Sequence, residues 1–497
     1  MEEQTGRGVI AFDNSYARLP ERFYSRVVPV AVTRPELIVV NVKLADDLGI
    51  DARWLESADG VQVLAGNRIA EGSQPLAQAY AGHQFGYFVP QLGDGRANLL
   101  GEVIGRDGVR YDIQLKGSGQ TPFSRRGDGR AALGPVLREY IVSEAMAALG
   151  VPTTRALAAV TTGEKVIRET LLPGAVFTRV AASHLRVGTF QYFAARGDVD
   201  GVRILADYAI ARHYPDLAGA KRRYRALLDG VIERHARLVA QWMLLGFIHG
   251  VMNTDNTSIS GETLDYGPCA FMEAYEPDKV FSSIDRQGRY AFGNQPQAAL
   301  WNLTRLAETL LPLLAEEEGN EAGAKASAVE ALDAFAPRMR AAHGAGLRRK
   351  IGLASEESGD MAMVEDLLER MTVNRADFTL TFRRLSAAVE GDGSARELFD
   401  EPASFDEWAA GWRSRLTREG EPGSMVASRM RAVNPAFIPR NHRVQEVIDA
   451  AVERVDFAPF HTMLDVVSRP YEDRAGLESF ATPARPEECV SQTFCGT

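Results

Sequence analysis

The feature that most constrains the fold of this 497-residue chain is a change of hydrophobic period near residue 185. Before this point, short segments alternate apolar and polar residues and are separated by glycine-containing turns, which is typical of antiparallel strands. Beyond it, apolar residues recur about every 3.6 positions, which is typical of helices that bury one face. Strands followed by helices predict an α+β fold with a β-rich first lobe and a larger helical second lobe.

Two antiparallel hairpins are predicted in the β-rich part, because apolar segments flank turns that contain glycine and residues 109–116 alternate apolar and polar. The turns are residues 105–108 and 162–165. The strands that they join are residues 97–104, 109–116, 156–161 and 166–170. A loop rich in glycine, serine and arginine, residues 117–129, follows the first hairpin and leads into a helix predicted over residues 135–149.

The helical part contains three long amphipathic segments. Helices are predicted over residues 224–247, 295–316 and 361–372. In the first of them, Leu227, Val231 and Leu238 fall on one face, which therefore packs against a core. Residues 316–327 are acidic and contain glycine, and a surface loop is predicted there.

Two segments of the β-rich part and its helix carry side chains suited to nucleotide phosphates. Gly93-Asp-Gly95-Arg96 precedes the first hairpin, and glycines let backbone N–H groups approach phosphate oxygens. Lys116 ends that hairpin and can supply a positive charge. Glu139 lies on the predicted helix, where kinase-like folds place a glutamate that orients the strand lysine.

Two further segments lie in the helical part. His249 and Asn256 keep the spacing of the kinase motif H-R-D-L-x-x-x-N, but Val251 occupies the position of the catalytic aspartate. Valine cannot accept a proton, so the usual kinase base is absent. Asp265-Tyr-Gly267 follows and is close to the metal-binding motif D-F-G. The side-chain oxygens of Asn256 and Asp265 suit a hard cation such as Mg²⁺, and Mn²⁺ accepts the same ligands.

Arginines reinforce this interpretation, since their planar donors match phosphate oxygens. They are Arg125, Arg126, Arg130, Arg179 and Arg186. Taken alone, any one of these residues, like a single glycine turn or lysine, is more often an ordinary surface feature than part of a site. The order of the four segments along the chain is what favours a nucleotide site.

Composition excludes several classes of function. The net charge of -10 argues against non-specific binding to nucleic acid or acidic membranes. No segment approaches the roughly 20 apolar residues that a membrane span requires, and the polar, acidic start does not resemble a signal peptide, so a cytoplasmic protein is expected. Three cysteines, Cys269, Cys489 and Cys495, form neither a disulfide framework nor a zinc motif. No coiled-coil pattern is present, and a monomer is expected.

The motifs together resemble the selenoprotein O family of protein adenylyltransferases, and the resemblance covers nearly the whole chain. Phe12-Asp-Asn14-Ser-Tyr-Ala-Arg-Leu19-Pro20 is similar to the opening motif of that family. More specific matches are Tyr80-Ala-Gly-His-Gln-Phe-Gly86, Gln91-Leu-Gly-Asp-Gly-Arg96, residues 114–130, residues 249–256 and residues 265–271.

The resemblance implies a protein-kinase-like fold that binds ATP in a flipped orientation, so that AMP rather than the γ-phosphoryl group is transferred to Ser, Thr or Tyr hydroxyls of proteins. Matched motif positions imply that ATP is contacted by Gly93, Gly95, Arg96, Lys116, Asp128, Gly129, Arg179 and Arg186. Glu139 would pair with Lys116, Asn256 and Asp265 would hold Mg²⁺ or Mn²⁺, and Asp255 would accept the proton of the attacking hydroxyl.

The resemblance also implies a division of the chain and a role for its end. The expected parts are an N-lobe with a family-specific extension (1–180), a helical C-lobe (181–480) and a flexible tail (481–497). Members of the family carry a cysteine or selenocysteine near the C-terminus, and Cys495 has this position. A disulfide between Cys269 and Cys489 or Cys495 that controls access to the cleft is a hypothesis.

Two other functions remain open at this point. The same site could transfer UMP or a phosphoryl group, since neither residue type nor spacing identifies the transferred group. Alternatively, the missing base at Val251 is compatible with a non-catalytic nucleotide-binding scaffold or redox sensor. The presence of both candidate metal ligands, Asn256 and Asp265, argues against a scaffold.

Overall fold

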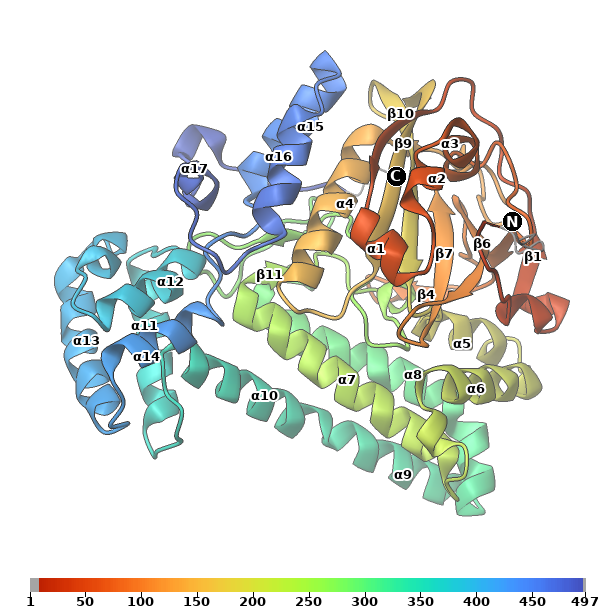
Figure 1. The fold of residues 1–497 in the computed structure, drawn as a ribbon. Coiled ribbons are helices and arrows are strands. Elements are labelled where there is room, and N and C mark those ends of the chain that lie inside the picture. Colours follow the sequence, from red (N-terminus) through yellow and green to blue (C-terminus); the bar gives the residue numbers. More distant parts are fainter. Residues whose placement is uncertain (1–8, 495–497) are drawn as a thin grey trace, which may run out of the picture.

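The computed structural model describes residues 9–494. The first lobe is built on an eight-stranded antiparallel sheet with the strand order β1-β3-β6-β7-β10-β9-β2, in which β8 pairs with β10 (Figure 1). Its strands are β1 Tyr24–Arg26, β2 Glu36–Val40, β3 Leu76–Gln78, β6 Ala97–Ile104, β7 Arg110–Lys116, β8 Ala131–Ala132, β9 Arg155–Ile167 and β10 Leu171–Ala181. The prediction of 97–104 as a strand is therefore confirmed to the residue.

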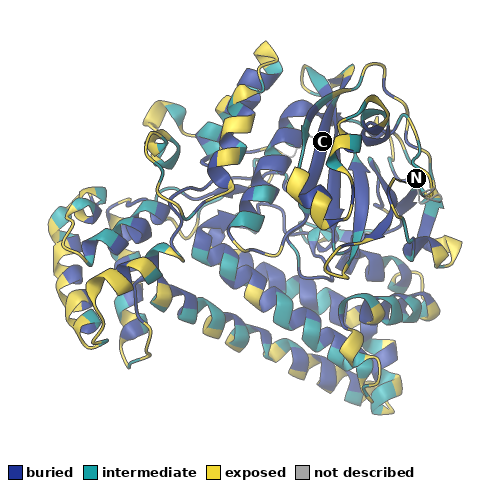
Figure 2. Ribbon diagram, in the orientation of Figure 1, coloured by how far each residue is buried: buried dark blue, intermediate teal, exposed yellow. Residues whose placement is uncertain are grey.

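Both faces of the sheet are covered, which explains why its strands are so apolar (Figure 2). The helices α1 Val42–Asp47, α2 Ala52–Leu55 and α3 Ala58–Leu64 cover one face, and α4 Leu133–Ala148 covers the other. Strand β10 shows the alternation: Val176 and Val180 belong to the core beneath α1–α3, and Phe177 belongs to the core beneath α4. Helix α4 is thereby fixed against the sheet.

The predicted turn at residues 162–165 is wrong. Strand β9 continues through these residues, and the chain reverses at 168–170, where the Arg168 N–H donates to the carbonyl of Thr170 at 3.0 Å. Gly163 has a φ of 70°, but it lies within the strand, at a shift of register between β9 and β10, and does not form a turn. Pairing of β9 with β10 on both sides of this residue, at Thr161 and at Lys165, keeps the strand intact.

The second lobe is helical. It contains α5 Val187–Ala194, α6 Val199–His213, α7 Arg223–Leu245, α8 Gln295–Glu318, α9 Glu321–Asp333 and α10 Phe335–Lys350. Helix α7 packs against α8, α9 and α10, and its predicted apolar face lies in the main core of the lobe. The loop predicted over 316–327 is wrong, because α8 runs to Glu318 and α9 begins at Glu321. Asn320 caps α9 by accepting a hydrogen bond from the Gly323 N–H.

The last helices divide into two groups (Figure 1). Helices α11 Asp360–Val373, α12 Phe378–Ala388, α13 Pro402–Thr417 and α14 Gly423–Arg431 extend the helical lobe. Helices α15 Asn441–Arg454 and α16 Ala458–Val467 instead return to the first lobe and pack on α4, and α17 Glu478–Ala481 follows them. The rings of Tyr140 on α4 and Phe460 on α16 lie 5.6 Å apart. The C-terminal part of the chain therefore braces the helix that carries Glu139.

The two-lobed α+β architecture agrees with the prediction made from hydrophobic period. Among residues 9–494, no helix has both the length and the apolar character needed to cross a bilayer.

Candidate active site

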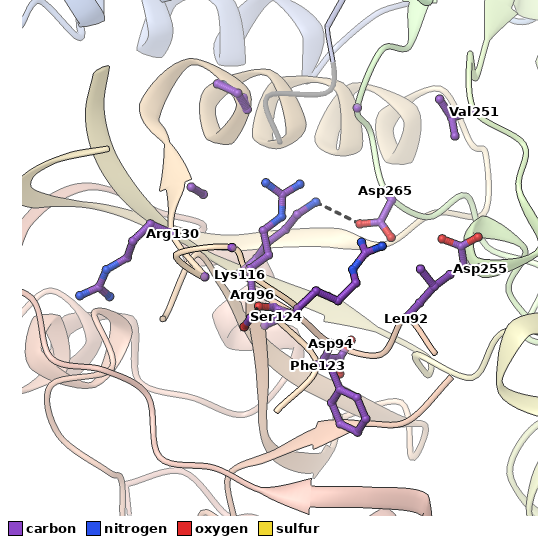
Figure 3. Close-up of a pocket in the computed structure, with 18 of the residues that line it drawn as sticks. Leu92, Asp94, Arg96, Lys116, Phe123, Ser124, Arg130, Val251, Asp255 and Asp265 are labelled. Carbon is purple, nitrogen blue, oxygen red and sulfur yellow. Dashed lines mark hydrogen bonds and ion pairs between the residues drawn. The ribbon is translucent and has the colours of Figure 1, made fainter. Parts of the chain in front are cut away.

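A cavity of about 1060 Å³ opens between the sheet, α4 and the loops that follow α7. Figure 3 shows that side chains from both lobes point into it, among them Lys116, Arg96, Asp255 and Asp265. The chain enters this region after α7 through the short strand β11 Phe247–Ile248, which pairs with β12 Ala270–Phe271. This pairing brings the segment that ends at Asn256 close to the segment that contains Asp265.

Lys116, Glu139 and Asp265 meet in this cavity. The Lys116 Nζ lies 3.0 Å from Asp265 Oδ1 (Figure 3). It also lies 2.6 Å from Glu139 Oε2. The three residues come from the end of β7, the middle of α4 and the loop before β12. The expected pairing of the strand lysine with the helix glutamate is thus present, and the same ammonium also reaches the second lobe.

Two buried arginines complete this charged cluster. Arg179 on β10 is only 2% exposed and contacts Asp265, while its Nη1 lies 3.2 Å from Glu139 Oε1. Arg186 donates from Nη1 to Asp265 Oδ2 at 2.8 Å and to the backbone oxygen of Asp255 at 2.6 Å. Three cations therefore surround the Asp265 carboxylate, and within the described part of the chain only one further carboxylate, that of Glu139, forms an ion pair with any of them.

The charges determine the ionisation of Asp265. Burial alone would raise the pKa of Asp265, but the charges of Arg179, Lys116 and Arg186 hold it well below its usual value. The backbone of Asp265 is left-handed, with a φ of 63°, which is uncommon for a residue other than glycine. Such strain is often found at functional sites, where surrounding contacts maintain it.

The loop from His249 to Asn256 is rigidly built. The His249 ring is buried, its Nε2 lies 3.0 Å from the backbone oxygen of Leu264, and burial lowers its pKa. Asn256 donates from Nδ2 to the backbone oxygen of Val251 at 3.0 Å. His249 therefore has a structural contact with the segment before Asp265, and Val251 contributes a carbonyl instead of a carboxylate.

Asp255 lies at the edge of the cavity and is 8% exposed. Burial raises its pKa to about 6, against the opposing charge of Arg186. Its Oδ1 is buried and has no hydrogen-bond partner among residues 9–494. A buried carboxylate oxygen with an unused acceptor position is suited to receive a proton from a bound molecule.

The glycines of the loop before β6 are required by packing as well as by any ligand. Gly93 has a φ of 71°, and a Cβ there would lie 2.3 Å from the ring of Phe123. A Cβ on Gly95 would lie 2.9 Å from the backbone oxygen of Phe123. The loop of Gly93 and Gly95 therefore packs against Phe123 of the loop over residues 117–129. Phe123 lies within a quoted motif, but the sequence did not predict this packing role.

The loop over residues 117–129 lines the same mouth. The Asp128 carboxylate accepts a hydrogen bond from Arg168 at 2.8 Å, and Gly129, with a φ of 69°, leaves room for the backbone of Gly119. Arg125 and Arg126 are exposed at the rim, and Arg130 donates to the carbonyls of Val30 and Ala31. Arg179 and Arg186 therefore reach the centre of the cavity, whereas Arg125, Arg126 and Arg130 lie at its border.

The donor set around Asp265 fits a divalent cation. The Asn256 amide is oriented by its bond to Val251, which leaves its oxygen as a ligand, and the Asp265 carboxylate is ionised. Residues 9–494 contain no group of three or more acidic, histidine or cysteine side chains able to hold a metal. A cation bound here would therefore need oxygen ligands from a phosphate or from water, as is usual for Mg²⁺.

The cysteine hypothesis concerns Cys269, Cys489 and Cys495. Cys269 is 3% exposed, and the C-terminal segment lies beside it: Thr493 donates its hydroxyl to the backbone oxygen of Pro268 at 2.6 Å. Phe494 lines the cavity. Cys489 is exposed, and Cys495 lies outside the described residues.

Sequence reasoning missed two residues that support the cluster. The ring of Tyr80 lies beneath the Arg186 guanidinium, 4.6 Å from its carbon to the ring centre. Asp94 is buried, and its Oδ2 accepts hydrogen bonds from the Gln78 N–H and the Gln114 amide; burial raises its pKa to about 6. Both stand within the quoted motifs, but their partners come from distant segments.

Comparison with known proteins agrees with this geometry. A family model described as protein adenylyltransferase SelO matches residues 8–468. Proteins named protein nucleotidyltransferase YdiU are similar over 98% of this chain and 99% of their own length. One from Methylorubrum extorquens is 65% identical over 495 residues, and one from a Bradyrhizobium species is 62% identical over 488 residues. The chain therefore belongs to the SelO family and is a nucleotidyltransferase.

Proposed function

We propose that this chain transfers AMP from ATP to Ser, Thr or Tyr hydroxyls of other proteins and releases pyrophosphate. The observation that carries the proposal is the convergence of Lys116, Arg179 and Arg186 on Asp265 in one cavity, with the buried carboxylate of Asp255 at its edge. The family description and the names of the relatives support nucleotidyl transfer to proteins.

In this proposal the triphosphate lies against the cationic cluster. Lys116, Arg179 and Arg186 donate to phosphate oxygens, because among residues 9–494 their three positive charges form ion pairs with only two carboxylates, those of Glu139 and Asp265. Further contacts come from Gly93, Gly95, Arg96, Asp128 and Gly129, which line the same cavity. Glu139 keeps the Lys116 ammonium in place through their 2.6 Å ion pair.

Asn256 and Asp265 would hold the divalent cation, Mg²⁺ or Mn²⁺. When bound, such a cation neutralises phosphate charge and helps to align the triphosphate. The chain itself supplies the group that accepts the proton. Asp255 receives the proton of the attacking hydroxyl, whose oxygen forms a bond to the α-phosphorus. The bond from the α-phosphorus to the bridging oxygen breaks, and its electron pair leaves with pyrophosphate.

The assignment of Asp255 rests on its neighbours. Val251 stands where a kinase carries its base, and its side chain cannot accept a proton. Asp255 is buried, and one of its oxygens has no partner among residues 9–494. The backbone oxygen of Asp255 is fixed by Arg186, so the same arginine links the proposed base to the phosphate cluster.

Radiolabelled nucleotide tests the proposal. The purified chain, a protein extract and Mg²⁺ are incubated with ATP that carries radioactive phosphorus at either the α or the γ position. We expect only the α label on protein, and mass spectrometry then identifies AMP on a hydroxyl side chain. Transfer of the γ label would indicate a kinase, and α-labelled UTP as the preferred donor would indicate UMP transfer. Absence of both label transfer and calorimetric nucleotide binding would refute the proposed site.

A further inference from the structure

A small hairpin outside the main sheet lies directly against the loop that carries Asp255. It consists of β4 Gly82–Gln84 and β5 Tyr87–Val89. Three consecutive hairpin residues bond to three consecutive loop residues. The backbone N–H of His83 donates to Thr254 Oγ1 at 2.6 Å, and that of Phe85 donates to Asn253 Oδ1 at 3.0 Å. Between them, the side-chain amide of Gln84 donates to Asp255 Oδ2 at 3.3 Å. The hairpin therefore contacts the loop at every residue from 253 to 255.

The turn of this hairpin is strained. Phe85 and Gly86 both have positive φ angles, 51° and 88°, as a two-residue type I′ turn requires. Phenylalanine is disfavoured at such a position, where asparagine or glycine is usual. The Phe85 ring packs 5.2 Å from that of Tyr290, whose hydroxyl donates to the same Asn253 oxygen at 2.8 Å. Contacts with the loop thus hold the strained turn in place, as is common near functional sites.

The Asp255 carboxylate depends on this hairpin for its orientation. Among residues 9–494, only the side chain of Gln84 donates a hydrogen bond to the Asp255 carboxylate, and the Oδ1 atom of that carboxylate has no partner. Gly82 leaves the space beside Oδ1, because a Cβ at Gly82 would lie 2.8 Å from that atom. Arg186 already binds the Asp255 backbone oxygen and is an alternative partner for the carboxylate.

We propose that Gln84 is a positioning residue for Asp255. Its amide donor holds Oδ2 and prevents the carboxylate from turning into an ion pair with Arg186, which would occupy the base. This inference rests on the proposed function, in which Asp255 accepts the proton of the hydroxyl. Gly82 assists by leaving room for the carboxylate in this orientation.

Two substitutions separate a hydrogen-bond donor from a space-filling side chain. Gln84→Ala removes the donor, and Gln84→Glu keeps the shape but replaces the donor with a second carboxylate. We expect Gln84→Ala to lower kcat about tenfold, the effect of losing a hydrogen bond to a charged group, with KM for ATP and Tm unchanged. Gln84→Glu should lose at least as much activity because like charges repel. Full kcat in Gln84→Glu, or a change in KM alone, would overturn the proposal.

A matched control lies on α15, where Gln445 donates to Asp449 at 2.7 Å far from the cavity. Gln445→Ala and Gln445→Glu should leave kcat unchanged. Crystal structures of the parent chain and Gln84→Ala supply a readout that does not depend on activity: the Asp255 carboxylate should rotate in the variant. An unmoved carboxylate would overturn the positioning role even if the parent chain transferred no AMP, whereas absent transfer with a rotated carboxylate would refute only the proposed function.

Discussion

Lys116 Nζ lies 2.6 Å from Glu139 Oε2, so the last residue of β7 is joined to the middle of α4 by an ion pair whose two side chains are 13% and 5% exposed. Helix α4 is itself fixed by the sheet on one side and by α15 and α16 on the other. The position of the ammonium is therefore determined by packing that reaches to the C-terminal part of the chain.

Glu139→Gln should lower both stability and transfer. The substitution removes the negative charge that pairs with the buried cations of Lys116 and Arg179. Breaking a buried ion pair in this way costs about 3 kcal/mol or more in the free energy of unfolding. Urea unfolding measures the loss, and the label assay measures activity. Glu316→Gln is the control, because its pair with Arg203 is partly exposed and should contribute at most about 1 kcal/mol. Equal effects of the two substitutions would contradict the role of Glu139.

Asp255→Asn should abolish transfer without preventing nucleotide binding. A general base contributes roughly 100-fold or more to the rate, and an amide of the same shape cannot accept the proton. We expect kcat to fall by at least that factor, while the calorimetric Kd for ATP changes little because the cationic cluster is intact. Asp278→Asn, on an exposed loop, should behave as the parent chain. Substantial transfer by Asp255→Asn would refute its assignment as the base.

Removal of divalent metal should stop the reaction and leave the fold unchanged. Asn256 and Asp265 offer too few ligands to bind a cation without phosphate, and Asp265 is already compensated by Lys116, Arg179 and Arg186. Excess chelator should therefore eliminate label transfer with little change in Tm. Addition of Mg²⁺ or Mn²⁺ in excess over the chelator should restore it. Transfer that persists in chelator would exclude a role for the cation.

Lys350, at the end of α10, should make stability depend on pH. It is 3% exposed, and burial lowers its pKa to about 7 from an ordinary 10.5, although its ammonium lies 4.4 Å from the ring centre of Phe382. Between these two pH values the unfolded chain binds the proton that folded Lys350 has lost, so the free energy of unfolding rises with pH.

Lys350→Met should remove this dependence. The variant should be more stable than the parent chain at about pH 6, and its advantage should shrink toward about pH 10. Urea unfolding across this range measures the difference. Lys325→Met, on the exposed side of α9, serves as the control. A constant difference between Lys350→Met and the parent chain at every pH would contradict the lowered pKa.

The cysteine hypothesis predicts a covalent link under oxidising conditions. Thr493 is hydrogen-bonded to Pro268, the residue before Cys269, so the C-terminal segment is already close to that thiol. Peptide mapping after mild oxidation should recover Cys269 linked to Cys495 or Cys489, with transfer reduced because the segment would be fixed beside the cavity. Recovery of unlinked cysteines alone would contradict the hypothesis.

Local patterns in the sequence predicted the elements and much of the site. The glycine-containing turns on either side identified the strand over 97–104, and motif spacing suggested both the Lys116–Glu139 pair and the proximity of Asp265. Such patterns failed where an element depends on its neighbours. Gly163 resembles a turn residue, but β9 pairs with β10 before and after it, at Thr161 and Lys165, so it stays within a strand. The acidic residues 316–327 form the end of α8 and the first half of α9, which pack together.

Residue types and their order by themselves determined a β-rich lobe, a helical lobe and a set of phosphate-binding and metal-binding candidates. Tertiary structure alone decided which of these side chains meet. Gln84 and Asp255 are 171 positions apart, and Tyr80 and Arg186 also come from separate segments of the chain. The physical reason is that hydrophobic period and turn chemistry act over a few residues, whereas contacts within the cavity depend on how whole layers pack.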